Sequence, residues 1–276
     1  MRKTANKILP DYLCKPYKQS NVVKKGLIVS LTSFPARIED VEIVIRCLKR
    51  QTILPEKILL WLSRKQFVTD DSIPQELIDL QDEIFEIILV EDDFRSHKKY
   101  YYACKNYPDN TIITCDDDQF YDPKMIERLL NNSASHPGCI IANKTSHIQH
   151  NNDGTLKSYI DWIENTDPSL TKNLLQIGLG GVLYPPHCMH DLLLREDLFF
   201  RLAPFADDIW LNTMARLKKT KIIQSDPVFL TLPISRHTES LADLNVGENM
   251  NDKQIRNIRE YLYENSFPDV YSNMYV

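Results

Sequence analysis

Short apolar runs alternate with helix-like segments through the first half of the chain. Runs rich in apolar and β-branched residues predict buried strands at 27–32, 57–62, 84–90 and 111–115. Between these strands, helices are predicted over 39–50, near 74–80 and over 98–106. Strands that alternate with helices in this way predict a largely parallel sheet, which binds ligands at the carboxyl ends of its strands.

The second half of the chain has a less regular pattern. Asp122 as N-cap, followed by Pro123 at the first helical position, predicts a helix that runs to Leu130. Shorter strands are expected at 159–163, 182–184 and 221–223, and helices at 207–217 and 252–263. The first 25 residues are polar and contain two prolines, which predicts an irregular arm.

Composition places the chain among ordinary globular proteins. Of its 276 residues, 43% are hydrophobic and 26% charged. The formal net charge of −5 argues against a general nucleic-acid binder, which usually carries a basic face. The six cysteines are scattered singly without a CxxC pair, as expected of thiols in a reducing compartment. Since the pattern shows neither a signal peptide nor a membrane span, a cytoplasmic location is the default expectation.

Three consecutive aspartates, Asp116, Asp117 and Asp118, directly follow the apolar strand at 111–115. Like charges this close repel one another, so stability alone explains them poorly. A Mg²⁺ or Mn²⁺ ion would remove the repulsion, because it accepts one or two carboxylates and completes its shell with substrate phosphates. Strand alternation would point Asp116 and Asp118 toward one ion and leave Asp117 for a ribose, a sugar hydroxyl or a basic side chain. From the triplet alone, a solvated acidic turn is an equal alternative.

Hydroxyl and basic side chains follow the first and third predicted strands. They would suit a nucleotide diphosphate, since arginine offers a planar fork and lysine a mobile charge to phosphate oxygens. The alternatives are a proline-containing β-to-α connection and an exposed charged loop. The candidate nucleotide-binding residues are Thr32, Ser33, Phe34, Arg37, Arg95, Lys98 and Lys99, and the two lysines are the better phosphate candidates after the third strand.

Two further segments attract attention. Three of the seven glycines lie at Gly178, Gly180 and Gly181, which indicates positive φ angles or a backbone close to a ligand. A tight turn before the strand at 182–184 explains them equally well, because the segment matches neither a dinucleotide fingerprint nor a P-loop. Asp207 and Asp208 precede an apolar helix, and helix capping explains only one of them.

Together, these segments resemble GT-A glycosyltransferases. A strand ending in Asp-x-Asp is similar to the metal and nucleotide-sugar motif of that fold. The segments at 30–37, 95–99, 178–186 and 207–211 resemble sugar transferases of bacterial surface-polysaccharide clusters, related to inverting family-two enzymes. The resemblance implies a GT-A (Rossmann-like, nucleotide-diphospho-sugar transferase) α/β fold with a mixed central sheet flanked by helices.

The resemblance also implies roles for individual residues. Asp208, or else Asp207, would be the base that deprotonates an acceptor hydroxyl, and the other would cap the helix. His237 matches a position at which many such enzymes supply a last metal ligand. The implied metal ligands for Mn²⁺ or Mg²⁺ are thus Asp116, Asp118 and His237, and Asp116, Asp117, Gly180 and Gly181 join the donor-binding residues.

The expected protein is a metal-dependent glycosyltransferase of the hexosyltransferase class. It would move a sugar from a nucleoside diphosphate sugar, with UDP favoured, to a saccharide or lipid-linked saccharide, with inversion, in capsular or other surface polysaccharide synthesis. A lipid-linked acceptor would permit weak peripheral association with the inner face of the cytoplasmic membrane. The expected organisation is an N-terminal arm (1–25), a catalytic domain (26–240, with its nucleotide-binding half at 26–122 and its acceptor half at 123–240) and a C-terminal helical tail (241–276).

Other functions fit parts of the same pattern. A nucleotidyltransferase also pairs aspartates with Mg²⁺ on an α/β sheet, but it would need a glycine-rich phosphate loop after the first strand, and 32–37 contains no glycine. A non-catalytic carbohydrate-binding protein on the same fold would be expected to have lost the metal or base carboxylates, and both sets are present.

Overall fold

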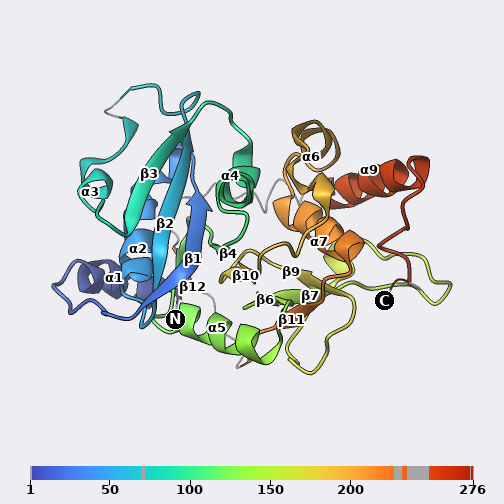
Figure 1. The fold of residues 1–276 in the computed structure, drawn as a ribbon, viewed down its shortest axis with the longest axis horizontal. Coiled ribbons are helices and arrows are strands. Elements are labelled where there is room, and N and C mark those ends of the chain that lie inside the picture. The colour runs from blue at the N-terminus through green and yellow to red at the C-terminus, as the bar shows by residue number, and fades with distance from the viewer. Residues whose placement is uncertain (1, 70–71, 227–231, 235–248, 274, 276) are drawn as a thin grey trace.

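A seven-stranded mixed sheet forms the centre of the protein (Figure 1). The computed structural model describes residues 2–69, 72–226, 232–234, 249–273 and 275. The strand order is β11–β6–β10–β4–β1–β2–β3, in which β10 runs antiparallel to both of its neighbours and the other pairs are parallel. The strands are β1 (Val23–Thr32), β2 (Leu54–Ser63), β3 (Phe85–Val90), β4 (Thr111–Thr114), β6 (Ile140–Ala142), β10 (Val182–Tyr184) and β11 (Ile222–Gln224).

Helices cover both faces of this sheet. The helices are α1 (Arg2–Leu13), α2 (Ile38–Lys49), α3 (Gln75–Ile78), α4 (Lys98–Asn106), α5 (Met125–Ser135), α6 (Glu196–Leu202), α7 (Asp207–Lys218) and α9 (Met250–Glu264). Along β1, Leu27, Val29 and Leu31 pack in one core cluster with α2 and α5, whereas Ile28 packs on the other face near α4. Because both faces are buried, the strands are apolar almost throughout. The predicted α/β class with a mixed sheet flanked by helices is confirmed.

Two small antiparallel sheets accompany the main one. β5 (Gln119–Phe120) pairs with β12 (Leu232–Pro233), directly after the aspartate triplet. β7 (Thr145–His147) lies between β8 (Ile163–Glu164) and β9 (Leu174–Gln176). In the described part of the chain, no helix combines the length and the apolar content needed to cross a membrane.

Three local predictions were wrong. The expected irregular arm contains α1, a helix with Pro10 inside it. The helix expected from Pro123 begins at Met125, and Asp122 instead accepts a hydrogen bond from the Lys124 N–H in the preceding turn. The strand expected over 159–163 is a 3-10 turn, η4 (Tyr159–Asp161), followed by β8, because the carboxylate of Asp252 on α9 fixes the Tyr159 N–H at 2.8 Å.

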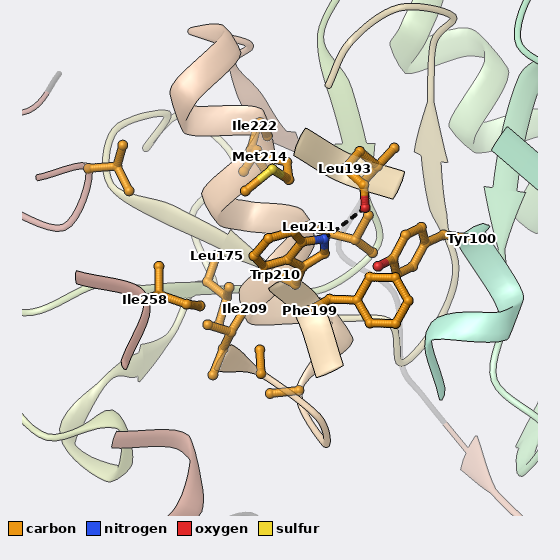
Figure 2. Packing of buried hydrophobic residues seen from close by; sticks show 14 of the residues in the cluster. Tyr100, Leu175, Leu193, Phe199, Ile209, Trp210, Leu211, Met214, Ile222 and Ile258 are labelled. Carbon is orange, nitrogen blue, oxygen red and sulfur yellow. Dashed lines mark hydrogen bonds between the residues drawn. The ribbon is translucent and has the colours of Figure 1, made fainter. Parts of the chain in front are cut away.

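Trp210 lies at the centre of the core that joins α7 to the sheet. Figure 2 shows its ring surrounded by Phe199, Leu211, Met214 and other apolar side chains, and it is only 1% exposed. Its indole N–H donates a hydrogen bond to the Leu193 carbonyl at 3.0 Å. This packing fixes α7, whose first turn carries Asp207 and Asp208.

Replacement of Trp210 by alanine should therefore destabilise the protein strongly. We expect a loss of about 3–5 kcal/mol in the free energy of unfolding, because a large cavity is left in the core. The matched control is Tyr263→Ala on α9, whose side chain is 86% exposed and which should change stability by less than about 0.5 kcal/mol. Urea unfolding measures both; equal values for the two variants would contradict this account of the core.

Candidate active site

A cavity of about 530 Å³ opens at the carboxyl ends of β1 and β4. Its walls come from the connection after β1, the start of α4, the turn after β4, and the first turns of α7 and α9. Twelve predicted site residues line it: Thr32, Ser33, Phe34, Arg37, Arg95, Lys98, Lys99, Asp116, Asp117, Asp118, Asp207 and Asp208. Segments that lie far apart in the sequence thus meet at the edge of the sheet where ligands of α/β proteins bind.

The aspartate triplet does not alternate as a strand would. β4 ends at Thr114, and Asp117 and Asp118 form a turn, so all three side chains line the same cavity. The prediction that Asp117 points away from its two neighbours is therefore wrong. The side chains of Asp116 and Asp118 are 27% and 28% exposed, whereas that of Asp117 is 9% exposed.

The connection after β1 holds the enclosed carboxylate in place. Ser33 Oγ donates to Asp117 at 2.6 Å, and Arg37 Nη1 lies 3.1 Å from Asp117 and 2.9 Å from Asp118. Burial raises the pKa of Asp117 to about 6, although Arg37 and the Ser33 hydroxyl favour its ionised form. Ser33 and Arg37 therefore contact the aspartate triplet itself. A basic side chain such as that of Arg37 was one of the partners expected for Asp117.

Lys99 occupies the centre of the cluster. Its ammonium lies 2.8 Å from Asp116 Oδ1 and 2.9 Å from Asp207 Oδ2, and the residue is 5% exposed. Burial disfavours the ammonium, but Asp116, Asp207 and Asp208 outweigh it and hold the pKa of Lys99 well above its ordinary value. The lysine thus links the turn after β4 to α7.

The other two cations of this region have partners of their own. Lys98 is buried, and its ammonium lies 2.6 Å from Asp93; burial lowers the pKa of Lys98 despite this ion pair. Arg95 has a positive φ of 52° and places its guanidinium 4.1 Å from the centre of the Phe205 ring. Both side chains line the cavity, as a phosphate role would require. That role stays a prediction.

Asp207 and Asp208 differ in environment although they are adjacent. α7 begins at Asp207, and its N-cap is Ala206, so neither aspartate caps the helix and the capping prediction was wrong. Burial opposes ionisation of Asp207, but Lys99 holds its pKa below the ordinary value. Burial and the neighbouring Asp207 raise the pKa of Asp208 to about 7. Asp207 is therefore a permanent counter-ion, and Asp208 can exchange a proton near neutral pH.

Gly178 is the glycine that the site requires. Its N–H donates to Asp208 Oδ2 at 3.0 Å. A Cβ atom there would lie 3.1 Å from the Lys99 ammonium and 3.2 Å from carboxylate oxygens of Asp116 and Asp208. The sequence pattern pointed to the glycine segment, but it did not identify this member as the one at the site.

Gly180 and Gly181 take the alternative role of a turn. Their φ angles are 102° and 96°, and Asn143 hydrogen-bonds to both carbonyls. A Cβ atom on Gly181 would lie 3.1 Å from the sulfur of Met125 on α5. Of the described residues in this segment, Ile177 and Leu179 line the cavity, and the donor-binding role expected of Gly180 and Gly181 stays a prediction.

Several lining residues carry no signal in the local sequence. Tyr159 comes from η4, Phe205 precedes α7, and Asn251 lies in the first turn of α9. The Oδ1 atom of Asn251 is buried without a hydrogen bond from the described residues. Only tertiary contacts, such as that between Asp252 and Tyr159, bring these residues to the cavity.

The site fits a divalent ion in part. Within the described residues, no three His, Cys, Asp or Glu side chains converge to form a ready-made metal site. His237 lies outside the described residues, so its predicted role as a ligand stays a prediction. Asp116 and Asp118 present partly exposed carboxylates to one cavity, and Mg²⁺ or Mn²⁺ is often held by one or two carboxylates together with substrate phosphates.

Comparisons with known proteins yield matches in solved structures alone. No protein-family model and no curated protein sequence matches the chain. Glucosyl-3-phosphoglycerate synthase from Mycobacterium tuberculosis, in complex with Mn²⁺, uridine diphosphate and phosphoglyceric acid, is 10% identical with a TM-score of 0.48, over 91% of this chain and 80% of that one. The 4-diphosphocytidyl-2C-methyl-D-erythritol synthase from Anaerococcus prevotii is 11% identical with a TM-score of 0.42, over 84% and 96%.

A third similar structure is HddC from Yersinia pseudotuberculosis, 13% identical with a TM-score of 0.36, over 58% of this chain and 76% of that one.

Proposed function

We propose that this protein is a metal-dependent glycosyltransferase that uses a nucleoside diphosphate sugar, with UDP as the favoured nucleotide. The observation that carries the proposal is the convergence of two carboxylate sets in one cavity. Asp116 and Asp118 follow the central strand β4, and the pair Asp207 and Asp208 starts α7, some ninety residues later in the chain. One set suits the diphosphate of a donor and the other suits the hydroxyl of an acceptor.

The donor side of the cavity is formed by the triplet and nearby cations. Asp116 and Asp118 would hold Mn²⁺ or Mg²⁺, which when bound supplies positive charge to the departing diphosphate. Arg37 lies beside Asp118, and the N–H groups along the edges of its planar guanidinium suit phosphate oxygens. Thr32 and Phe34 line the same wall and suit the nucleoside.

The acceptor side depends on Asp208. Gly178 anchors its Oδ2 atom, and its Oδ1 atom has no hydrogen bond from the described residues. Oδ1 of Asp208 would remove the proton of an acceptor hydroxyl. At the same time the hydroxyl oxygen of the acceptor would bond to the anomeric carbon, and the bond from that carbon to the diphosphate would break. This single displacement inverts the anomeric centre. The ion pair between Asp207 and Lys99 keeps Asp207 charged throughout.

The proposed acceptor is a saccharide or a lipid-linked saccharide in the synthesis of a capsular or other surface polysaccharide. A lipid-linked acceptor would place the protein at the inner face of the cytoplasmic membrane through weak peripheral contact. Phe205 and Tyr159 provide an apolar wall near Asp208 on which a sugar ring can pack.

Nucleotide sugars should stabilise the protein in a metal-dependent way. With Mn²⁺ present and ligand at a hundredfold excess over Kd, binding adds about 2.7 kcal/mol to stability. Thermal unfolding with a panel of UDP- and GDP-sugars measures this. The effect should disappear in Asp118→Ala and persist in the control Asp109→Asn, whose side chain is 84% exposed. Equal stabilisation of Asp118→Ala would refute the metal assignment.

Product analysis with the purified protein distinguishes the proposed glycosyl transfer from nucleotidyl transfer. Pyrophosphate release from UTP and a sugar 1-phosphate would identify a nucleotidyltransferase, whereas UDP release from a UDP-sugar supports the proposal.

Asp208→Asn should abolish most transfer without abolishing donor binding. We expect the rate of transfer to fall roughly 10²–10⁴-fold, because the general base is lost, while Mn²⁺-dependent stabilisation by UDP remains. In the unmodified enzyme, Asp208 must be ionised to accept the proton. The rate should therefore rise with pH through about 7 and level off above it, with a lower midpoint when bound Mn²⁺ adds positive charge nearby. Full transfer rates in both Asp208→Asn and Asp207→Asn would show that the base is elsewhere.

Asp208→Asn should also stabilise the ligand-free protein. The pKa of Asp208 is about 7 in the folded chain and 3.8 ordinarily, so the folded state loses stability as pH rises between these values. The amide removes this penalty and can still accept from the Gly178 N–H. We expect a higher Tm at pH 8, by roughly 2–4 °C for each kcal/mol relieved, and little change at pH 4. Scanning calorimetry at both pH values measures this, and a lower Tm at pH 8 would contradict the electrostatic account.

A further inference from the structure

A second pocket, of about 210 Å³, lies at the opposite end of α7 from Asp208. Three of its lining residues are lysines and a fourth is an arginine, and no Asp or Glu is among the described residues that line it. The cations are Lys172, Lys219, Lys221 and Arg216. In a chain with a net charge of −5, such a local concentration of positive charge requires an explanation.

Arg216 is the centre of this pocket and is only 9% exposed. Its hydrogen bonds go to neutral oxygen atoms: the Val270 carbonyl at 2.6 Å, the Tyr275 carbonyl at 3.3 Å and Asn173 Oδ1 at 3.4 Å. Burial lowers the pKa of Arg216, and the charges of nearby tyrosines and Asp269 offset this lowering only in part. A buried cation without a carboxylate among its described contacts is costly, and an anion in the pocket would relieve that cost.

The three lysines extend this charge to the pocket rim. All are exposed, and none forms an ion pair with a described residue. Lys219 and Asn173 adopt left-handed backbone conformations, with φ of 62° and 53°, which are uncommon for residues other than glycine. Both turns line the pocket, and their backbone carries Lys172, Lys219 and Lys221.

The helix dipole does not account for the cluster. The carboxyl end of a helix carries about half a negative charge, far less than four cations balance. Two carbonyls at the end of α7 already have partners, since the Lys219 and Thr220 N–H groups donate to those of Arg216 and Ala215. The pocket therefore keeps a large excess of positive charge.

We propose that this pocket binds a phosphoryl group other than the donor diphosphate. The Nη1 group of Arg216 forms no hydrogen bond with a described residue, and the lysines provide mobile charges, which together suit phosphate oxygens. The helical rise from Asp208 to Lys219 is about 16 Å, too far for the phosphates of one diphosphate to reach both sites. The phosphoryl group belongs either to a soluble phosphorylated compound or to a phospholipid headgroup. The inference does not depend on the proposed transferase activity.

Calorimetric titration with inorganic phosphate at constant ionic strength tests the site. In the double variant Lys219→Glu/Lys221→Glu, phosphate should bind about tenfold more weakly, because two attractive charges become repulsive. The control, Lys18→Glu/Lys24→Glu, makes the same change in net charge at exposed lysines that do not line the pocket and should bind within about twofold of the unmodified protein. Circular dichroism verifies that both variants are folded.

Vesicles distinguish the two sources of the phosphoryl group. A lipid headgroup would be identified if the unmodified protein sediments with phosphatidylcholine vesicles that contain phosphatidic acid but not with pure phosphatidylcholine vesicles. The pocket variant should then lose this sedimentation, and the control should keep it. Pocket-dependent binding of phosphate without vesicle binding would identify a soluble ligand. The proposal is overturned if phosphate binds the pocket variant and the control equally, or if the unmodified protein binds neither phosphate nor anionic vesicles.

Discussion

The ammonium group of Lys99 is the contact on which the candidate site depends. It lies within 2.9 Å of carboxylates from the turn after β4 and from the start of α7, and it is almost fully buried. Without it, Asp116, Asp207 and Asp208 would be like charges in a partly dehydrated cavity, and the cost of keeping them ionised would be severe. Lys99 stands at the start of α4, which packs against β1 and β2, so the sheet itself fixes the position of the charge. The two halves of the chain are thereby joined at the place where the chemistry is proposed.

The site combines carboxylates that favour opposite protonation states, which is unfavourable for folding and useful for catalysis. Asp207 is held ionised by Lys99, whereas Asp208 and Asp117 have raised pKa values because burial outweighs their favourable contacts. A fold can carry such a cluster only when its core is extensive elsewhere. The two large apolar clusters on either side of the sheet, one around α2 and α5 and the other around Trp210, provide that stability.

The sequence pattern predicted the first four strands because they are apolar almost throughout, as burial of both faces requires. It predicted α2, whose apolar residues recur at helical spacing, and it also predicted α4 and α7. It failed where structure depends on distant partners. The turn at Tyr159 needs Asp252, and the helix after Asp122 starts late, where the Gln51 side chain accepts from the Ile126 N–H. The candidate residues on strand ends reached the cavity because topology places those ends together. Tyr159 and Asn251 were missed as site residues since nothing in their neighbouring residues marks their position, and Gly178 was recognised only as part of a glycine segment. The alternation expected of the triplet failed because β4 stops at Thr114, before the first aspartate.

α7 carries opposite chemistry at its two ends, and its dipole supports both. Asp207 and Asp208 occupy the amino-terminal turn, where the partial positive charge of the helix favours ionised carboxylates. Arg216 and Lys218 occupy the last turn, where the partial negative charge favours cations. The dipole is small beside the desolvation of Asp208, whose pKa still reaches about 7, so burial sets the basicity of that group and the dipole only moderates it. At the other end the dipole is small beside the four cations, so the pocket there keeps its attraction for an anion. The same helix therefore presents a carboxylate to one cavity and a positive field to the other. Its length sets the separation of the two, and the packing of Trp210 holds the helix in the core.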